Sequence, residues 1–302
     1  MGTGTSYHRA VPVLTLLCPS ARPELTDAAV REAAAGRSVG EVRWLAAGYA
    51  VEADVDGSDA VDDQVWGRWQ ELGIDVVVQP DGPRRRRVLV ADMDSTMIRQ
   101  ECIDELAAYA GVGERVADIT ARAMNGELDF AAALHERVAL LRGLPATVTD
   151  TVIAERITFT SGGDVLLATM RAHGAYTALV SGGFTHFTRV VAGRLGFDEH
   201  RANTLEVDGG RLTGRVVLPV LGQEAKVSAL QDIAASRGVR PADVLAIGDG
   251  ANDIPMLRLA GTGLALHAKP VVSAQVPVRV NQGDLTSALF LQGYAEAELV
   301  RP

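Results

Sequence analysis

Hydrophobic positions change their spacing near residue 84. Before that point, apolar runs of strand length alternate with two amphipathic helical segments. The predicted strands cover residues 11–18, 44–47, 49–55 and 74–78, and the predicted helices cover residues 24–34 and 62–72. The order β-α-β-β-α-β is that of a ferredoxin-like α+β domain. Because residues 79–83 are rich in Pro and Gly, we predict a linker there and a first domain over residues 1–83.

The rest of the chain contains strands that are apolar without interruption. The predicted strands cover residues 88–91, 176–180, 244–247, 262–266 and 276–280, and helical segments lie between them at 165–172, 187–195, 224–236 and 253–259. Continuous apolar strands that alternate with helices indicate a parallel sheet covered on both faces. We therefore predict a Rossmann-like α/β core within a second domain over residues 84–302. In such a sheet, ligands bind at the carboxyl ends of the strands.

A long helical stretch interrupts this alternation between the first two core strands. Residues 100–157 are nearly all helical in pattern, and Phe130, Leu134, Val138 and Leu141 recur at the spacing of one helix face. The stretch is too long for a single crossover. We predict a helical cap inserted at about residues 100–158. Farther along, two short strands flank the turn at residues 208–210 as a β-hairpin.

Composition and charge exclude several functional classes. The chain has 302 residues, of which 47% are hydrophobic, and a net charge of −9, so it can form a core and has no basic surplus for nucleic acid or a membrane surface. No apolar run reaches the length of a membrane span. Residues 1–9 lack signal-peptide features, which predicts a cytoplasmic protein.

Cys18 and Cys102 form neither a disulfide framework nor a zinc pattern. The arginines at 84–87 are too few for a basic tail and predict a solvated linker or the entry to a strand.

Two predicted strands end in polar residues suited to phosphate chemistry. The first is followed by Asp92 and Asp94, whose charges would repel unless a cation compensates them or one holds a proton. The second is followed by Ser181, Gly182 and Gly183, where the glycines let backbone N–H groups approach an anion closely. Each motif alone also fits an ordinary turn.

A lysine and one further motif complete the set of candidate residues. Lys226 lies near the start of a predicted helix, where it could neutralise the paired carboxylates. Asp249, Asn252 and Asp253 belong to the segment G-D-G-A-N-D-I-P-M-L at a strand-to-helix junction, where Asn252 or Asp253 could also merely cap the helix.

Taken in order and spacing, these motifs resemble the haloacid dehalogenase superfamily. The strings D-M-D-S-T, M-N-G-E-L-D-F, E-R-V-A-L-L-R-G-L and V-S-G-G-F are similar to those of its phosphoserine phosphatase family. The first 83 residues resemble, by element order, an ACT-like regulatory domain. This copy has the segment P-S-A-R-P where an ACT-like domain carries a glycine-bearing ligand loop.

The resemblance implies a Mg²⁺-dependent hydrolase that forms an aspartyl-phosphate. Asp92 is the implied nucleophile and Asp94 the implied general acid and base. Asp92, Asp94 and Asp249 are the implied metal ligands, and Asp94 would bind through its backbone carbonyl. Asp253 would lie in the outer coordination shell, without direct contact to the metal. Lys226 would offset negative charge on the transferred phosphoryl group.

The resemblance also implies how O-phosphoserine would bind. Glu101 would bind its amino group and Arg137 its carboxylate, while Ser181 and the N–H of Gly182 would hold phosphate oxygens. The remaining implied substrate-side residues are Met124 and Phe130, as an apolar wall, and Asn252. Cys102, next to Glu101, fits a small buried hydrophobe.

Other functions remain open from the sequence. A phosphotransferase that passes phosphate from phosphoserine to homoserine, or a phosphatase for another small phosphomonoester, would share the aspartyl-phosphate. A non-catalytic amino-acid sensor is disfavoured because the catalytic set is complete. The ACT-like resemblance implies a homodimer and an amino-acid effector at the first domain, with dimerisation alone or shielding as the alternative.

Overall fold

The N-terminal part is a four-stranded antiparallel sheet with two helices. A computed structural model describes residues 11–22, 24–58 and 60–302, so the expectation drawn from residues 1–9 lies outside the described residues. The sheet order is β2-β3-β1-β4, and the predicted order β-α-β-β-α-β is confirmed. The elements are β1 (Val13–Leu17), α1 (Asp27–Ala33), β2 (Val39–Ala46), β3 (Ala50–Val55), α2 (Asp63–Glu71) and β4 (Asp75–Gln79).

Local signals set where these two helices begin. Thr26 accepts a hydrogen bond from the Ala29 N–H at 3.2 Å and caps α1. Asp62 accepts from the Gln64 N–H at 2.9 Å and caps α2 in the same way. Helix α1 is therefore shorter than the predicted helix over residues 24–34, because the chain becomes helical only after the cap at Thr26.

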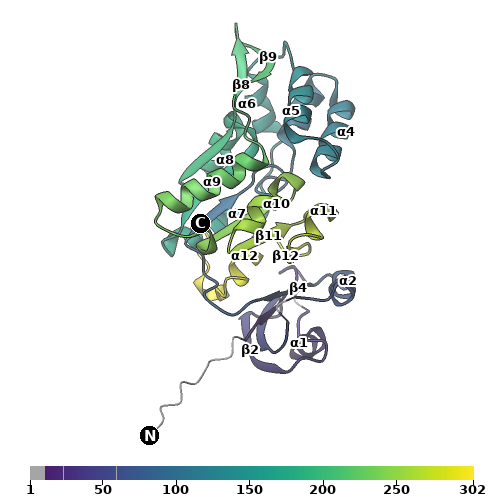
Figure 1. Cartoon of the computed structure of the whole chain (residues 1–302), viewed down its shortest axis with the longest axis vertical. Coiled ribbons are helices and arrows are strands. Elements are labelled where there is room, and N and C mark those ends of the chain that lie inside the picture. The colour runs from purple at the N-terminus through teal and green to yellow at the C-terminus, as the bar shows by residue number, and fades with distance from the viewer. Residues whose placement is uncertain (1–10, 23, 59) are drawn as a thin grey trace.

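The core is a six-stranded parallel sheet with strand order β12-β11-β10-β5-β6-β7 (Figure 1). Its strands are β5 (Val88–Ala91), β6 (Tyr176–Phe184), β7 (Glu199–Asn203), β10 (Val244–Gly248), β11 (Thr262–Leu266) and β12 (Val278–Val280). Its helices are α7 (Gly163–Ala172), α8 (Thr185–Leu195), α9 (Gln223–Ser236), α10 (Ile254–Leu259), α11 (Pro270–Ser273) and α12 (Ser287–Phe290). Short 3₁₀ turns cover Pro241–Asp243, Ala251–Asp253 and Glu296–Glu298.

Both faces of this sheet are buried, which explains its uninterrupted apolar strands. Val88 and Val90 of β5 pack into one hydrophobic cluster, while Leu89 and Ala91 pack into another. Successive residues of a strand point to opposite faces, so both clusters require apolar side chains at every position.

The edges of the core sheet differ most from the sequence prediction. Strand β7 has the polar sequence E-H-R-A-N and was not predicted, because an edge strand with exposed positions carries no apolar run. The last predicted strand is shorter than expected, since only Val278–Val280 pairs with β11. The predicted hairpin is present as β8 (Leu205–Asp208) and β9 (Arg211–Val216).

Four helices form the cap between β5 and β6 (Figure 1). They are α3 (Cys102–Tyr109), α4 (Gly113–Met124), α5 (Phe130–Ala139) and α6 (Val148–Glu155). The two linkers that join the cap to the core lie side by side. Gln100 and Thr158 exchange two hydrogen bonds, at 2.8 and 2.9 Å, and Ile98 forms an antiparallel bridge with Phe159.

The N-terminal sheet is packed firmly against the core. Leu17, Ala50 and Val77 share one hydrophobic cluster with Leu289 and Phe290 near the C-terminus. In Figure 1, the yellow C-terminal segment lies between the two sheets. No helix of the described ranges is long and apolar enough to span a bilayer.

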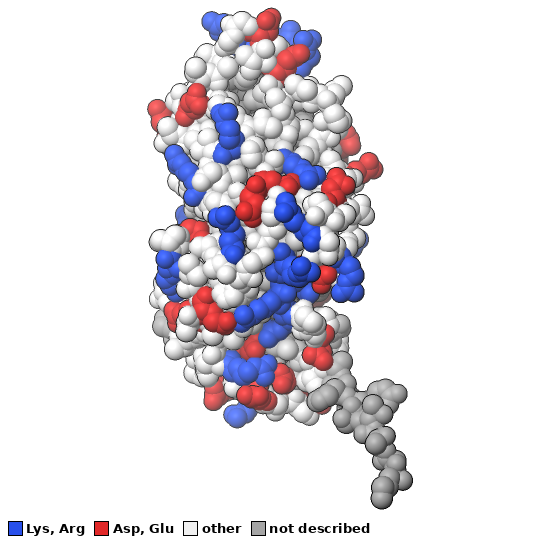
Figure 2. All heavy atoms as spheres, turned by 90° about the vertical axis from the view of Figure 1, so that its left-hand side faces the viewer, with Lys and Arg blue, Asp and Glu red and all other residues white. Residues whose placement is uncertain are grey.

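The arginines at 84–87 lead into β5, as the strand-entry alternative predicts, and two of them form part of this packing rather than a solvated linker. Arg84 is an ion-pair partner of buried Glu52, with 2.7 Å between Nη2 and Oε2. Arg86 donates to the carbonyls of Pro83, Ala242 and Gly261. Figure 2 shows basic side chains concentrated in the lower half of one face. The sequence could not predict these contacts, because most of the partners lie far away along the chain.

Candidate active site

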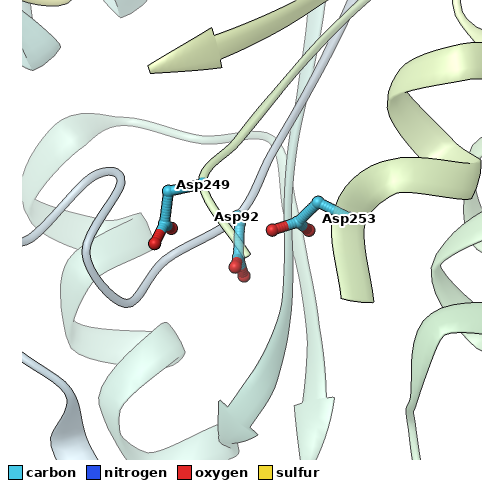
Figure 3. A group of neighbouring side chains, drawn as sticks. All are labelled: Asp92, Asp249 and Asp253. Carbon is cyan, nitrogen blue, oxygen red and sulfur yellow. The ribbon is translucent and has the colours of Figure 1, made fainter. Parts of the chain in front are cut away.

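Three buried carboxylates meet at the carboxyl edge of the core sheet (Figure 3). Asp92 follows β5 and Asp249 follows β10, which pairs with β5, so the two strand ends lie next to each other. Asp253 ends the 3₁₀ turn that leads into α10. One oxygen from each carboxylate lies within 4.8 Å of the others. Such crowded carboxylates repel one another unless a cation compensates their charge or one of them holds a proton.

Lys226 supplies part of the compensating charge. It lies in the first turn of α9 and is completely buried, with Nζ 2.8 Å from Asp92 Oδ1 and 2.6 Å from Asp253 Oδ1. Burial by itself would lower the pKa of Lys226, but the two carboxylates outweigh it and raise that pKa above its ordinary value, so the side chain remains charged. The structure thus brings together a lysine and aspartates that are far apart in the sequence.

The residues around Asp249 fit a divalent cation. Asp249 Oδ1 accepts a hydrogen bond from Thr96 Oγ1 at 2.9 Å, while Oδ2 is buried without a hydrogen-bond partner. A buried carboxylate oxygen without a donor is costly unless it binds a cation. Asp253 differs, since Oδ1 accepts from Lys226 and Oδ2 from the Gly250 N–H. Asp92 and Asp249 are therefore the better placed ligands.

The two aspartates after β5 are electrostatically perturbed. Burial, and then the charge of Asp253, raises the pKa of Asp92 to about 7. Burial, and then the charge of Glu101, raises the pKa of Asp94 well above its ordinary value. The raised pKa of Asp94 favours its protonated form, which is the form that can donate a proton.

The Ser181-Gly182-Gly183 segment lies opposite these aspartates. The segment lies within the last part of β6, and the Gly183 N–H donates to Ser181 Oγ at 2.9 Å. A Cβ atom on Gly182 would lie 2.5 Å from the Phe130 ring, and one on Gly183 would lie 2.6 Å from Asp94 Oδ2. A side chain at either position would therefore displace Phe130 or Asp94 from its place in the site.

The cap contributes one negative and one positive side chain to the site. Glu101 lies at the start of α3, and its Oε1 accepts a hydrogen bond from Ser95 Oγ at 2.6 Å. Arg137 lies in α5, where Nη1 donates to Thr120 Oγ1 at 3.0 Å. Its Nε donates to the Ala133 carbonyl at 3.1 Å. Both side chains line the same small cavity as Asp92.

That cavity is small. Its volume is about 30 Å³, and it is lined by Asp92, Asp94, Glu101, Ile103, Met124, Phe130, Leu134, Arg137, Ser181, Gly182, Gly183, Phe184 and Asn252. The volume suffices for about two water molecules, so the cap must move to admit a larger molecule. Every residue predicted for the substrate side is in this set.

Several supporting residues were missed by sequence reasoning. Ser95 holds Glu101, Thr96 holds Asp249, and Thr120 holds Arg137 while donating to Asp104 at 2.6 Å. Ser95 and Thr96 stand in the D-M-D-S-T string and could have been found there. Nothing in the sequence marks Asp104 or Thr120, because their contact joins two helices across a loop.

Comparison with known proteins shows the family to which the chain belongs. The sequence profile of the haloacid dehalogenase-like hydrolases matches residues 89–258. The chain is 46% identical over 230 residues to a phosphoserine phosphatase of Streptomyces coelicolor, covering 76% of this chain and 56% of that protein. It is 46% identical over 198 residues to a phosphoserine phosphatase of Streptococcus thermophilus, covering 66% of this chain and 92% of that protein.

A solved structure extends the similarity to the N-terminal part. The probable phosphoserine phosphatase of Vibrio cholerae, in its unliganded form, superposes with a TM-score of 0.74 at 31% identity. The match covers 96% of this chain and 88% of that one. The chain thus spans just over half of the Streptomyces relative and nearly all of the Streptococcus one. By its profile match and by relatives above 40% identity, the chain belongs to the haloacid dehalogenase-like hydrolases and, among them, to the phosphoserine phosphatase family.

Proposed function

We propose that the protein hydrolyses O-phospho-L-serine to serine and phosphate. The observation that carries this is that Glu101 and Arg137 line one small cavity together with Asp92. A carboxylate and a guanidinium complement the ammonium and carboxylate of an amino acid, and the nucleophile lies where its phosphate would reach. Hydrolysis of this ester would be the last step in forming serine.

The residues divide the reaction into two steps. Asp92 attacks phosphorus and forms an aspartyl-phosphate, while Asp94 gives its proton to the departing serine oxygen. Asp94 then takes a proton from water as the water attacks phosphorus and releases phosphate from Asp92. Ser181 and the Gly182 N–H hold the phosphate oxygens. Lys226, which contacts Asp92, stabilises negative charge on the transferring group.

We propose Mg²⁺ as the bound cation. Asp92, the Asp94 carbonyl and Asp249 would hold it, with Asp253 and Asn252 positioning Lys226 and water. When bound, it would neutralise charge on the phosphoryl oxygens.

The pH dependence of stability tests this metal site. In the metal-free protein the pKa of Asp92 rises from its ordinary 3.8 to about 7, so the folded state binds more protons than the unfolded state in that interval. This contribution to stability is lost as the pH rises. Because Mg²⁺ binds the ionised carboxylates, we expect it to raise Tm by several degrees at about pH 8 and by much less at about pH 5. Equal shifts at both pH values, or an undiminished shift in Asp249→Asn, would contradict the site.

A substrate panel tests the activity. Phosphate release would be measured from L-phosphoserine, phosphothreonine, phosphoethanolamine and p-nitrophenyl phosphate, each with and without Mg²⁺. We expect a metal-dependent preference for phosphoserine. Turnover of the aryl phosphate without that preference would place the substrate elsewhere among small phosphomonoesters, and product formed only with an alcohol acceptor would indicate a phosphotransferase.

Arg137→Ala tests the recognition of the substrate carboxylate. We expect kcat/KM for phosphoserine to fall about 100-fold and kcat/KM for p-nitrophenyl phosphate to change less than about threefold, because only phosphoserine has a carboxylate. Arg115→Ala is the matched control, since Arg115 is an exposed cap arginine that pairs with Glu136. An equal loss on both substrates in Arg137→Ala would mean that Arg137 only supports the cap.

Other expectations for the whole protein remain proposals. We propose that residues 1–83 are an ACT-like domain and residues 84–302 the phosphatase domain, that the protein acts as a homodimer in the cytoplasm, and that an amino-acid effector acts at the N-terminal part. The ferredoxin-like strand order supports the ACT-like domain. Two free, buried cysteines, Cys18 and Cys102, support a reducing compartment such as the cytoplasm.

A further inference from the structure

A buried asparagine that the proposed mechanism does not use contacts the phosphate-binding segment, Ser181–Gly183. Asn203 is the last residue of β7 and is 2% exposed. Its Nδ2 donates to the Gly182 carbonyl at 2.8 Å and to the Leu221 carbonyl at 3.2 Å. Its Oδ1 accepts from the Leu221 N–H at 2.7 Å. A side-chain amide offers two N–H donors and one oxygen acceptor, so both ends of Asn203 are engaged.

The strand pairing explains why the Gly182 carbonyl needs a side-chain partner. Strands β6 and β7 pair regularly as far as Val180 and pair again at Phe184, and the segment 181–183 between these positions is out of register. Such an irregularity removes backbone groups from the regular ladder of hydrogen bonds. The side chain of Asn203 supplies the donor that the neighbouring strand does not. The segment can therefore depart from the ladder, beside the catalytic cavity that it lines, with this carbonyl still hydrogen-bonded.

The same contact holds the peptide group between Gly182 and Gly183. Asn203 binds the C=O of that peptide, and Ser181 Oγ accepts its N–H at 2.9 Å. Two successive glycines have no Cβ atoms to restrict the backbone, so this peptide would otherwise turn readily. Because the Gly183 N–H occupies one lone pair of Ser181 Oγ, the Ser181 O–H is directed to a different acceptor. In the catalytic cavity that Ser181 lines, this acceptor would be a phosphate oxygen.

On its other side, Asn203 holds the chain that leads into α9. Leu221 immediately precedes Gly222, the N-cap residue of α9, and exchanges two hydrogen bonds with the Asn203 amide. The first turn of α9 contains Lys226, whose backbone N–H donates to the Gly222 carbonyl at 3.0 Å and whose Nζ lies 2.8 Å from Asp92 Oδ1. One buried amide therefore joins the phosphate-binding segment to the helix that carries the active-site lysine.

We propose that Asn203 is a positioning residue for phosphate binding. Asn203 does not line the catalytic cavity, so it acts through the Gly182 carbonyl and the backbone of Leu221. It fixes the phosphate-binding segment relative to Lys226, because both must hold the same phosphoryl group. This role rests on the proposed phosphatase function. It concerns the phosphate alone and leaves recognition of the amino-acid part of the substrate to the cap.

Calorimetric titration of the full chain in the presence of Mg²⁺ tests this role, with inorganic phosphate and L-serine as separate probes. Asn203→Asp keeps the size and the oxygen acceptor but loses both N–H donors, and Asn203→Ala is an uncharged counterpart. In both variants we expect phosphate to bind at least about tenfold more weakly and the affinity for L-serine to change less than about threefold. A merely structural asparagine would weaken both probes together or neither, and either result in both variants would overturn the proposal.

Asn125→Asp is the matched control. Asn125 is an exposed asparagine of the cap that does not line the catalytic cavity, so this variant makes the same charge change and should bind both probes normally. In Asn203→Ala, kcat/KM should fall at least about tenfold, and by a similar factor, for phosphoserine and p-nitrophenyl phosphate, whereas Arg137→Ala should affect mainly phosphoserine. A loss confined to phosphoserine in Asn203→Ala would contradict a role in phosphate binding.

Hydrogen exchange in the unsubstituted chain tests the link to α9 without a variant. Saturating phosphate should slow exchange of the Leu221 N–H, which donates to Asn203 and lies outside the catalytic cavity, and should leave the Thr177 N–H, which donates to Asp198, unchanged. Absence of protection at Leu221 would overturn the link. If the unsubstituted protein bound phosphate but hydrolysed no phosphoester, the phosphatase proposal would fail while the titrations still decided the role of Asn203.

Discussion

Asp92→Asn is expected to reduce phosphate release by at least about four orders of magnitude. The amide nitrogen and oxygen cannot replace a carboxylate as nucleophile, although their size and shape are nearly the same. Asp92 Oδ1 already accepts from Lys226 and from the Met93 N–H, so only Oδ2 remains to attack phosphorus. Steady-state phosphate release measures the loss. A pre-steady-state measurement then shows whether any first-turnover burst of product remains.

The fold of this variant should remain intact. Asparagine keeps an oxygen acceptor for Lys226, and removing one of several crowded carboxylates relieves repulsion in the metal-free protein. Asp198→Asn is the matched control, since Asp198 also accepts from a backbone N–H, that of Thr177, but lies away from the catalytic cavity. Near-normal turnover in Asp92→Asn would refute the assigned nucleophile, and a Tm far below that of the control would mean that lost folding explains the result.

Lys226→Met is expected to damage both stability and turnover. Methionine has a similar length but no charge, so Asp92 and Asp253 would remain buried without their counter-ion. Breaking a buried pair in this way costs about 3–5 kcal/mol. Urea unfolding at neutral pH without metal measures that loss, and kcat for phosphoserine should fall together with it because Lys226 also stabilises the transferring group.

The other lysine of the chain provides the comparison. Lys269 is half-buried and has no ion-pair partner among the described residues, so Lys269→Met should change the free energy of unfolding by less than about 1 kcal/mol. Adding Asp253→Asn to Lys226→Met removes one unpaired charge and should recover part of the stability without recovering turnover. A loss below about 1 kcal/mol in Lys226→Met would contradict the buried charge pair.

Much of the architecture was predictable because its signals are local. Uninterrupted apolar strands indicated a sheet buried on both faces, and a parallel sheet brings the carboxyl ends of its strands to one edge. That rule alone was enough to predict that Asp92, Ser181 and Asp249 lie at the same edge of the sheet. The cap residues Glu101 and Arg137 were different, since only the family resemblance marked them and their spacing alone did not.

What the sequence by itself determined was most of the elements, the carboxyl-edge motifs and the family. Tertiary structure alone decided which groups share a buried space. It gave Lys226 two partners, left Asp249 Oδ2 without a donor, and joined Asp75 to a loop more than 200 residues away. The physical reason is that burial and electrostatic coupling depend on distance in space, whereas periodicity and capping depend only on neighbours along the chain.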